Sequence, residues 1–197
     1  SPDGIKMAVS YMRVNGNKIS THIAFYNFGS AGQMELNNQV GELNVDAVLA
    51  PQIFFCDNST AVAVRTDGFT VFSGSQSPKE KKTVKFDQEI ISTFHDGNRI
   101  GFVFDGGDSG HKYLMKVYNT GGKNTMQKYF DLQYNSITLQ KDKIVLFNEK
   151  EFAIYKLNGQ KTFQGKYRKP IQNVLSIRGF RKYMVITEDS ADLIRLG

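Results

Sequence analysis

The sequence predicts an all-β chain that folds as a β-propeller-like series of four-stranded antiparallel blades. Short apolar runs with the two-residue alternation of β-strands recur along the 197 residues, separated by turns that contain Gly, Asn or Pro. The pattern of short strands repeats with a period of about 40 residues, which is typical of propeller blades. No window of about eleven residues keeps helical i, i+3, i+4 apolar spacing without an intervening turn residue. We therefore expect strands throughout and almost no helix.

The clearest repeat unit lies between Asn98 and Asp131. Apolar side chains alternate in its first two runs: Ile100, Phe102 and Phe104, followed by Tyr113, Met115 and Val117. Gly106-Gly107 and Gly121-Gly122 supply the turns that separate the runs of this unit. Together with a preceding run at Ile90–Phe94, the unit accounts for one four-stranded blade.

The same reasoning predicts strands along the rest of the chain. Ser1-Pro2-Asp3-Gly4 is a tight-turn sequence before the first strand, and Asn15-Gly16 is a strong hairpin signal after it. We expect residues 41–47 to form a loop. The expected strands outside the clearest unit are Lys6–Val14, Ile19–Phe28, Gln33–Val40, Leu49–Cys56, Thr60–Arg65, Phe69–Ser73, Lys82–Phe86, Tyr134–Leu139, Lys143–Phe147, Phe152–Leu157, Lys161–Lys166, Ile171–Ile177, Tyr183–Thr187 and Leu193–Leu196.

Two recurring features fix the register of the repeat. The second strands (AVAV, FVF, IVLF and YMVI) are apolar on both faces, as a strand packed between two neighbouring blades requires. An ordinary sandwich would show cleaner one-face alternation. The third strands carry a matching tripeptide: Phe25-Tyr26-Asn27, Val71-Phe72-Ser73, Val117-Tyr118-Asn119, Ile154-Tyr155-Lys156 and Leu193-Ile194-Arg195.

We expect a single propeller-like domain over 1–197, with approximate blades at 1–41, 42–87, 88–131, 132–169 and 170–197. The predicted strands total 18, with three in the first unit and three in the last, so the chain holds about 4.5 blades of a partial ring. The first unit begins at its second strand. Because each blade is apolar on both flanks, we expect the end blades to meet further blades upstream of Ser1 or to self-associate.

Composition excludes several classes of protein. Cys56 is the single cysteine, so no internal disulfide can form, and no Cys or His cluster has the spacing of a structural zinc site. No apolar run reaches the length of a membrane span, and the first residues lack the order of a signal peptide. The net charge of +6 and the runs KEKK (79–82), KYRK (166–169) and RGFRK (178–182) would suit an anionic polymer, although solvated blade edges explain them better.

Part of the sequence resembles a known family. The stretch SPDGIKMAVSYMRVNGNKISTHIAFYNFGSAGQ looks like the shared segment of an uncharacterised family of Gram-positive bacterial proteins, and AVAVRTDGFTVFSGSQSP and KPIQNVLSI extend the likeness. The resemblance implies an exported, propeller-like repeat domain that an N-terminal transmembrane helix upstream of Ser1 holds outside the membrane. It implies no activity.

No motif identifies a catalytic, cofactor-binding or metal-binding residue. Residues 105–111 (DGGDSGH) gather carboxylates and an imidazole, but Gly107 stands where a calcium loop needs its second ligand, so we expect a plain hairpin loop. His22, His95 and His111 stand singly, which favours surface or hydrogen-bonded histidines over zinc ligands or catalytic bases. Neither a GxSxG elbow nor a glycine-rich phosphate loop is present.

These observations favour a non-enzymatic, extracytoplasmic binding or scaffold module of a bacterial envelope protein. It would recognise another protein or a cell-wall ligand through its blade loops, without a cofactor and without nucleic acid. The alternatives are a hydrolase or lyase that uses the central channel and a module that binds an anionic polymer or nucleic acid. The inner strand ends near Gln52, Ser92, Ser136 and Asn173 predict a polar, uncharged lining. Two or more carboxylates or histidines converging there would favour the enzyme instead.

Overall fold

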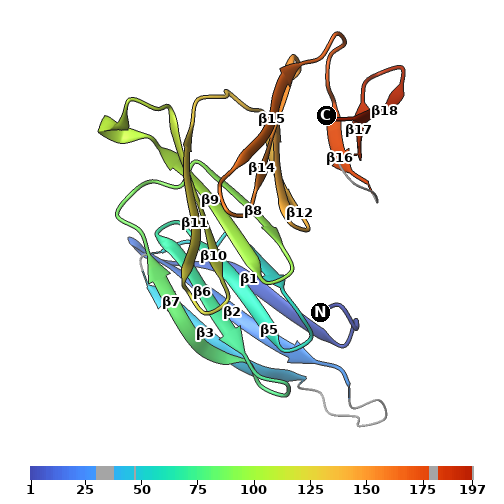
Figure 1. The fold of residues 1–197 in the computed structure, drawn as a ribbon. Helices are drawn as coiled ribbons and strands as arrows, with labels where there is room; N and C mark the ends of the chain where they lie inside the picture. Colours follow the sequence, from blue (N-terminus) through green and yellow to red (C-terminus); the bar gives the residue numbers. More distant parts are fainter. Residues whose placement is uncertain (30–37, 47, 178–181, 197) are drawn as a thin grey trace. The chain divides into compact units, whose positions relative to one another are not determined.

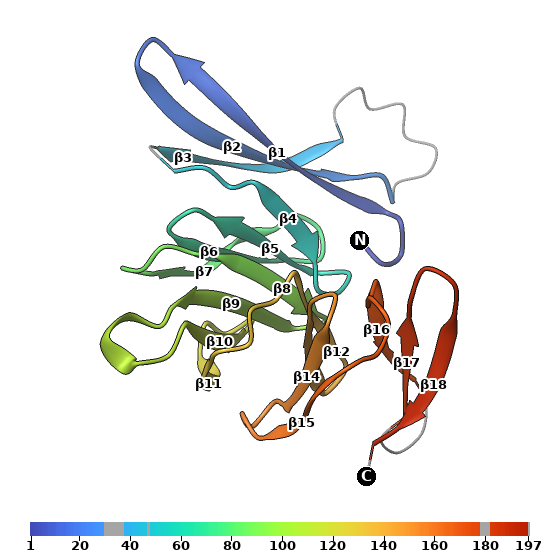
Figure 2. The same ribbon diagram turned by 90° about the horizontal axis from the view of Figure 1, so that it is seen from above.

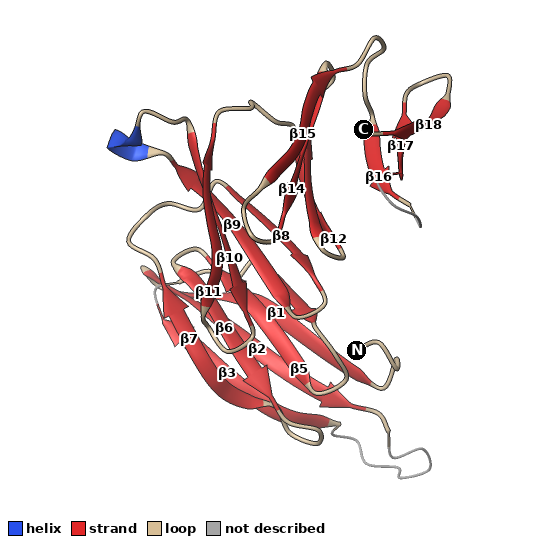
Figure 3. Cartoon of the chain, viewed as in Figure 1, coloured by secondary structure: helices blue, strands red, loops and turns tan. Residues whose placement is uncertain are grey.

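The structure is a computed structural model of the chain and describes residues 1–29, 38–46, 48–177 and 182–196. These residues form 18 β-strands, and their one helical segment is a 3-10 turn at Gly107–Ser109 (Figure 3). The predicted all-β fold is therefore confirmed. No helix in the described ranges is long and apolar enough to cross a membrane.

The strands form five antiparallel sheets, and the strands of each sheet follow one another in sequence order (Figures 1 and 2). Three sheets have four strands and two have three, as the repeat predicts. The strands are β1 (Lys6–Asn15), β2 (Lys18–Asn27) and β3 (Gln39–Asp46); β4 (Gln52–Phe55), β5 (Thr60–Arg65), β6 (Gly68–Ser73) and β7 (Lys79–Lys85); β8 (Ser92–Asp96), β9 (Arg99–Asp105), β10 (Tyr113–Asn119) and β11 (Asn124–Phe130); β12 (Ser136–Gln140), β13 (Lys143–Phe147), β14 (Glu151–Lys156) and β15 (Lys161–Lys166); and β16 (Asn173–Ser176), β17 (Lys182–Ile186) and β18 (Ala191–Arg195).

Two compact units contain these sheets, one with β1 to β7 and the other with most of β8 to β11 and all of β12 to β18. In the first unit, Ile23 and Phe25 of β2 pack with Ala61, Ala63 and Phe72 of the next sheet. In the second unit, one core joins sheet β8–β11 to sheet β12–β15, and another joins sheet β12–β15 to sheet β16–β18. Within each unit, neighbouring sheets thus bury apolar flanks against each other, as propeller blades do.

Several predicted strand bounds differ from the structure by two or more residues, and the corrections at β3 and β7 matter most. β3 runs from Gln39 to Asp46, so the predicted loop at 41–47 is strand over most of its length, and residues 33–37 of the predicted strand lie outside the described ranges. The sequence of β3 is polar and contains Gly41, and its pairing with β2 rather than its own pattern makes it a strand. β7 begins at Lys79 and not at Lys82 as predicted, so the whole KEKK run (79–82) lies in an edge strand.

A β-bulge recurs at the same place in four sheets. The register of the paired strands shifts between Phe25 and Tyr26, Val71 and Phe72, Val117 and Tyr118, and Ile154 and Tyr155. These are the dipeptides that the sequence aligns as third strands, so the predicted repeat register is confirmed. Threonine supports two of the bulges, because Thr125 Oγ1 donates to Val117 O at 3.1 Å and Thr162 Oγ1 donates to Ile154 O at 3.2 Å.

The last sheet departs from the expected burial. β5, β9 and β13 are buried on both faces, as predicted for second strands. In β17, Tyr183 and Val185 are buried, whereas Met184 and Ile186 on the opposite face are only half-buried. The first pair packs against sheet β12–β15, and nothing in the described part of the second unit covers the other pair as fully. The prediction of apolar packing on both faces was therefore wrong for this strand.

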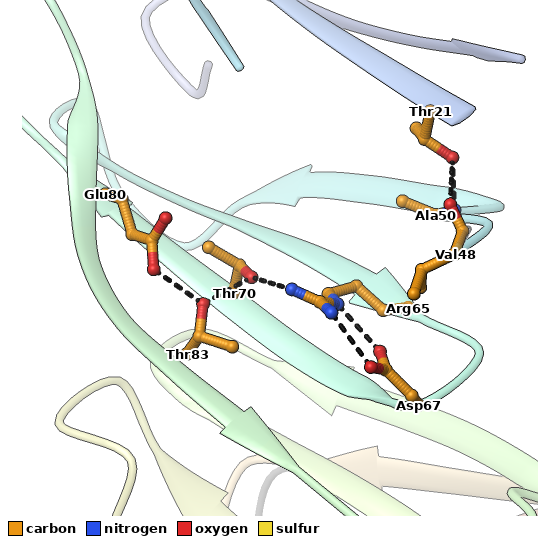
Figure 4. A network of polar contacts seen from close by, with 8 residues as sticks. All are labelled: Thr21, Val48, Ala50, Arg65, Asp67, Thr70, Glu80 and Thr83. Carbon is orange, nitrogen blue, oxygen red and sulfur yellow. Dashed lines mark hydrogen bonds and ion pairs between the residues drawn. The ribbon is translucent and has the colours of Figure 1, made fainter. Parts of the chain in front are cut away.

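Arg65 is the one buried charged residue of the sheet β4–β7 core within the described ranges (Figure 4). Its Nε and Nη2 donate to Asp67 Oδ1 and Oδ2 at 2.8 and 2.9 Å, and its Nη1 lies 3.4 Å from Thr70 Oγ1. Thr70 and Thr83 share a hydroxyl hydrogen bond of 2.7 Å, and Thr83 donates to Glu80 at 2.8 Å. This chain of polar contacts links three adjacent strands, β5 to β7, and satisfies a charge that would otherwise be costly to bury.

Candidate functional site

A pocket of about 370 Å³ lies where the first strands of the last two sheets begin. It belongs wholly to the second unit. Its walls come from the start of β12, the turn between β13 and β14, and the segment that leads into β16. The lining residues are Asn135, Ser136, Thr138, Phe147, Asn148, Glu149, Ile171, Gln172 and Asn173.

Backbone hydrogen bonds hold the three walls together. Asn135 N donates to Phe147 O at 2.9 Å, which joins the start of β12 to the end of β13. Ile171 N donates to Glu149 O at 2.9 Å and so fixes the connecting segment against the β13–β14 turn. Gln172 N donates to Ile186 O at 2.8 Å. Bonded backbone on all sides preorganises the lining side chains for a ligand.

Amides and hydroxyls dominate the chemistry of this pocket. Asn148 is committed to the turn, because its Nδ2 donates to Gln133 O at 2.5 Å and its Oδ1 accepts from Lys150 N at 2.8 Å. Asn135 and Gln172 are exposed, so their amides are accessible to a ligand, and Phe147 and Ile171 supply a buried apolar floor. Amides offer both donors and acceptors, so the pocket suits an uncharged ligand rich in hydrogen-bonding groups.

The structure brings together two of the four inner strand ends singled out by the sequence. Ser136 and Asn173 line the same pocket. Ser92 lies in the same unit but outside this pocket, and its Oγ accepts a 2.7 Å hydrogen bond from Tyr134 Oη. Gln52 opens β4 in the other unit. The pocket contains one carboxylate, Glu149, and no histidine among its described lining residues.

A second cavity of about 360 Å³ lies between the end of β11 and strands β14 and β15. Here His111 Nδ1 lies 2.9 Å from Asp131 Oδ2, and the imidazole stacks on Tyr129 with ring centroids 5.7 Å apart. Lys112 N donates to Asp131 Oδ1 at 3.0 Å. The hydrogen bonds from His111 and Lys112 lower the pKa of the Asp131 carboxyl. Asp131 thus anchors the loop at residues 105–111, in which Asp105 also accepts from Gly107 N at 2.7 Å.

The histidines have hydrogen-bonding or ion-pairing neighbours. His22 is buried, with Nδ1 bonded to Asn44 and Nε2 at 3.4 Å from Glu42 Oε2. Burial lowers the pKa of His95, although the charge of Asp96 acts in the opposite direction and raises it. In the described ranges, no three His, Cys, Asp or Glu residues come close enough to hold a metal ion. No sequence motif predicts the pairing of His111 with Asp131, because 20 residues separate them.

The chain resembles known proteins in its sequence and in its fold. A model described as "Family of unknown function (DUF5711)" matches residues 1–196. No curated protein sequence matches the chain. Hsv2 of Kluyvelomyces marxianus is similar in structure, with a TM-score of 0.59 and 10% identity over 92% of this chain and 57% of that chain. BamB from Moraxella catarrhalis gives a TM-score of 0.51 and 10% identity over 93% of this chain and 60% of that chain.

BBS1N, crystallised in complex with ARL6DN, gives a TM-score of 0.53 and 9% identity over 85% of this chain and 58% of that chain. This chain spans about three fifths of the length of the three solved chains. Hsv2, BamB and BBS1N are β-propeller proteins. At these identities the likeness concerns the fold alone, and it confirms the propeller-like architecture.

Proposed function

The chain belongs to DUF5711, a family of unknown function, and we propose that it is a non-enzymatic binding or scaffold module. The proposal rests mainly on the pocket at the start of β12 and β16, whose exposed amides and hydroxyls suit recognition. Its one carboxylate, Glu149, lacks the second acid or base that most hydrolytic mechanisms use. The fold supports a binding role less specifically than the pocket does. Propellers host many functions, and the three solved neighbours share only the fold with this chain.

The proposed ligand is another protein or a cell-wall ligand that presents uncharged amide or hydroxyl groups. Both sources offer the donors and acceptors that the exposed amides of Asn135 and Gln172 can pair, and Asn173 can still donate from Nδ2 while its Oδ1 accepts from Val174 N at 2.8 Å. BBS1N offers a parallel, since its structure contains a bound protein, ARL6DN. We propose that this module lies outside the cytoplasmic membrane of a bacterium, and the resemblance of its sequence to exported Gram-positive proteins supports this location. Digestion of the protein by a protease added to intact protoplasts tests that location, and full protection would contradict it.

Site-specific photo-crosslinking tests the ligand. Benzoylphenylalanine replaces Gln172 in the pocket, and in a matched control it replaces Gln127, which is exposed on β11 away from the pocket. In bacteria that produce the protein, we expect an adduct at position 172 and none at position 127. Mass spectrometry then distinguishes a peptidoglycan fragment from a protein. Equal labelling at both positions, or no adduct at position 172, would sink the proposal.

The alternative of an anionic-polymer module rests on lysines such as those of β7, which are exposed at a sheet edge. Binding to heparin would then weaken steeply with salt, by about 10³-fold or more between roughly 50 and 200 mM for about six contacts. We expect weak binding with a shallow salt dependence, because edge lysines also serve to discourage strand pairing.

A further inference from the structure

β15 is an open edge strand with an uncharged centre. It is the last strand of its sheet, and Lys161, Thr162, Gln164 and Lys166 are exposed. Lysines stand only at its two ends, so the stretch from Thr162 to Gly165 carries no charge. The equivalent strand β7 (KEKKTVK) has charges through its first half. Because charged side chains blunt an edge strand against pairing, β15 is the less protected of these two edges.

The backbone of β15 has a defined outward-facing side. Tyr167 N donates to Lys150 O at 2.8 Å, directly beyond the end of the strand. Antiparallel pairs alternate between bonded and non-bonded positions. In this register Gly165, opposite Phe152, bonds to β14, whereas the backbone groups of Gln164 and Lys166 point away from it. An added strand would bond to these two residues.

Hollows flank the strand on its exposed side. An open hollow of about 560 Å³ is lined by Glu151 and all of β15. The cavity that holds His111 and Asp131 is lined in part by Lys161 and Gln164. Side chains of an added strand point alternately to opposite faces, so neighbouring residues would reach different hollows. A peptide that extends a sheet edge gains affinity from the backbone and specificity from such hollows.

Charge favours an acidic residue at the start of β15. Lys128 and Lys161 both line the cavity between β11 and β15. The Asp131 carboxylate in this cavity is already engaged by His111 and by Lys112 N. Glu151 also lines this cavity, but it pairs in register with Lys166, at the opposite end of the strand. The Lys161 end is therefore the more attractive end for an incoming carboxylate.

We propose that β15 docks an extended peptide segment of a partner protein, which adds antiparallel to the sheet with an acidic residue beside Lys161. An antiparallel peptide places its C-terminal residue next to the first residue of β15. The acidic residue therefore stands at the C-terminal end of the docked segment. This surface is distinct from the pocket at β12 and β16, so the two proposals can fail independently.

The test uses a fluorescein-labelled peptide with the sequence Thr-Val-Thr-Val-Thr-Glu, amidated at its C-terminus, and a control peptide that ends in Lys. Fluorescence anisotropy with the full chain should show binding of the Glu peptide that is about tenfold or more tighter than binding of the Lys peptide. Hydrogen exchange should slow at the amides of Gln164 and Lys166 when the Glu peptide binds. No exchange protection, or equal affinity for both peptides, overturns the proposal.

Two variants locate the contact. Gln164→Pro removes an outward N–H at a position where an edge strand tolerates proline. This variant should therefore bind the Glu peptide about tenfold more weakly. Lys161→Glu reverses the charge and should invert the preference, so that the Lys peptide binds more tightly. The charge reversal keeps the test decisive even where proline disturbs the strand. If the Lys161→Glu variant still binds the Glu peptide more tightly than the Lys peptide, docking at this edge is contradicted.

Discussion

Arg65 shows how one side chain can fix a blade from within. Its side chain is 8% exposed and forms two hydrogen bonds to Asp67, so the guanidinium depends on that carboxylate for charge compensation. We expect Asp67→Asn to lower the free energy of unfolding by about 2 to 3 kcal/mol, because a buried charge loses its partner while Asp67 itself is partly solvated. Urea unfolding at neutral pH measures the change.

The matched control is Lys169→Gln, which removes the exposed ion pair between Lys169 and Asp189, 3.0 Å apart. An exposed pair contributes about 1 kcal/mol or less, so this variant should unfold almost as the wild type does. Equal losses in the two variants would show that burial of Arg65 does not govern the stability of its sheet.

Cys56 should be an unreactive thiol. Burial, with a smaller effect from the Asp57 charge, raises its pKa to about 11. The thiolate is the reactive form, so at pH 8 the folded protein should hold about a hundredfold less of it than an unfolded chain does. Alkylation by iodoacetamide should be correspondingly slow in the native protein and should accelerate as pH rises toward 11. Equal rates in native and urea-unfolded protein at pH 8 would contradict this.

At the scale of single elements, glycine marks places where strands approach closely. Gly68 has a φ of +146°, and an added Cβ would lie 2.0 Å from Val84 O of the neighbouring strand. Gly97 has a φ of +54°, and an added Cβ would meet nothing within 4 Å. We expect Gly68→Ala to cost about 3 kcal/mol or more, because the clash is with backbone. Gly97→Ala should cost only about 1 to 2 kcal/mol of conformational strain.

Thermal unfolding of the two glycine variants checks this ranking. Equal midpoint temperatures of unfolding in the two variants would mean that β6 and β7 can separate without a loss of stability. The paired register from Gly68 to Ser73 argues against such a separation.

Most strands could be predicted from the sequence because their turns carry strong local signals. Thr60–Arg65 and Lys143–Phe147 were predicted with the same bounds that the structure shows, since turn residues flank an apolar run in both. The bounds of β3 were predicted wrongly because its strand conformation depends on pairing with β2 and not on its own composition. Local pattern decides a strand only where the pattern is strong.

The candidate site was only partly predictable. The polar character of the inner strand ends at Ser136 and Asn173 was visible in the sequence. The contributions of Glu149 and Gln172 were not, because they depend on how the β13–β14 turn and the segment before β16 pack together. The pairing of Arg65 with Asp67 had a possible signal in the sequence Arg-Thr-Asp-Gly, which places a cation and an acid on either side of a hairpin turn.

At the scale of the whole molecule, the flank of sheet β16–β18 that faces away from sheet β12–β15 determines behaviour in solution. Leu175 and Leu193 are 37% and 61% exposed, Met184 lies between them in the register, and Ile186 follows Met184 on the same face of β17. The other flank of the same sheet is buried against its neighbour. Propeller flanks of this kind are stable when another sheet covers them. An exposed flank of this kind therefore favours association with a second copy of the chain.

We expect the 197-residue chain to self-associate through this flank, because a second copy would cover its exposed apolar side chains. Lys182 pairs with Arg195 at one end of the sheet. A two-fold contact with reversed strands keeps these cationic ends apart. Leu193→Lys should therefore shift the chain toward monomer, whereas Gln127→Lys adds the same charge at an exposed position on β11 and should not. Light scattering across a concentration series separates the outcomes, and a monomeric wild type that binds no hydrophobic dye would show that this flank needs no cover.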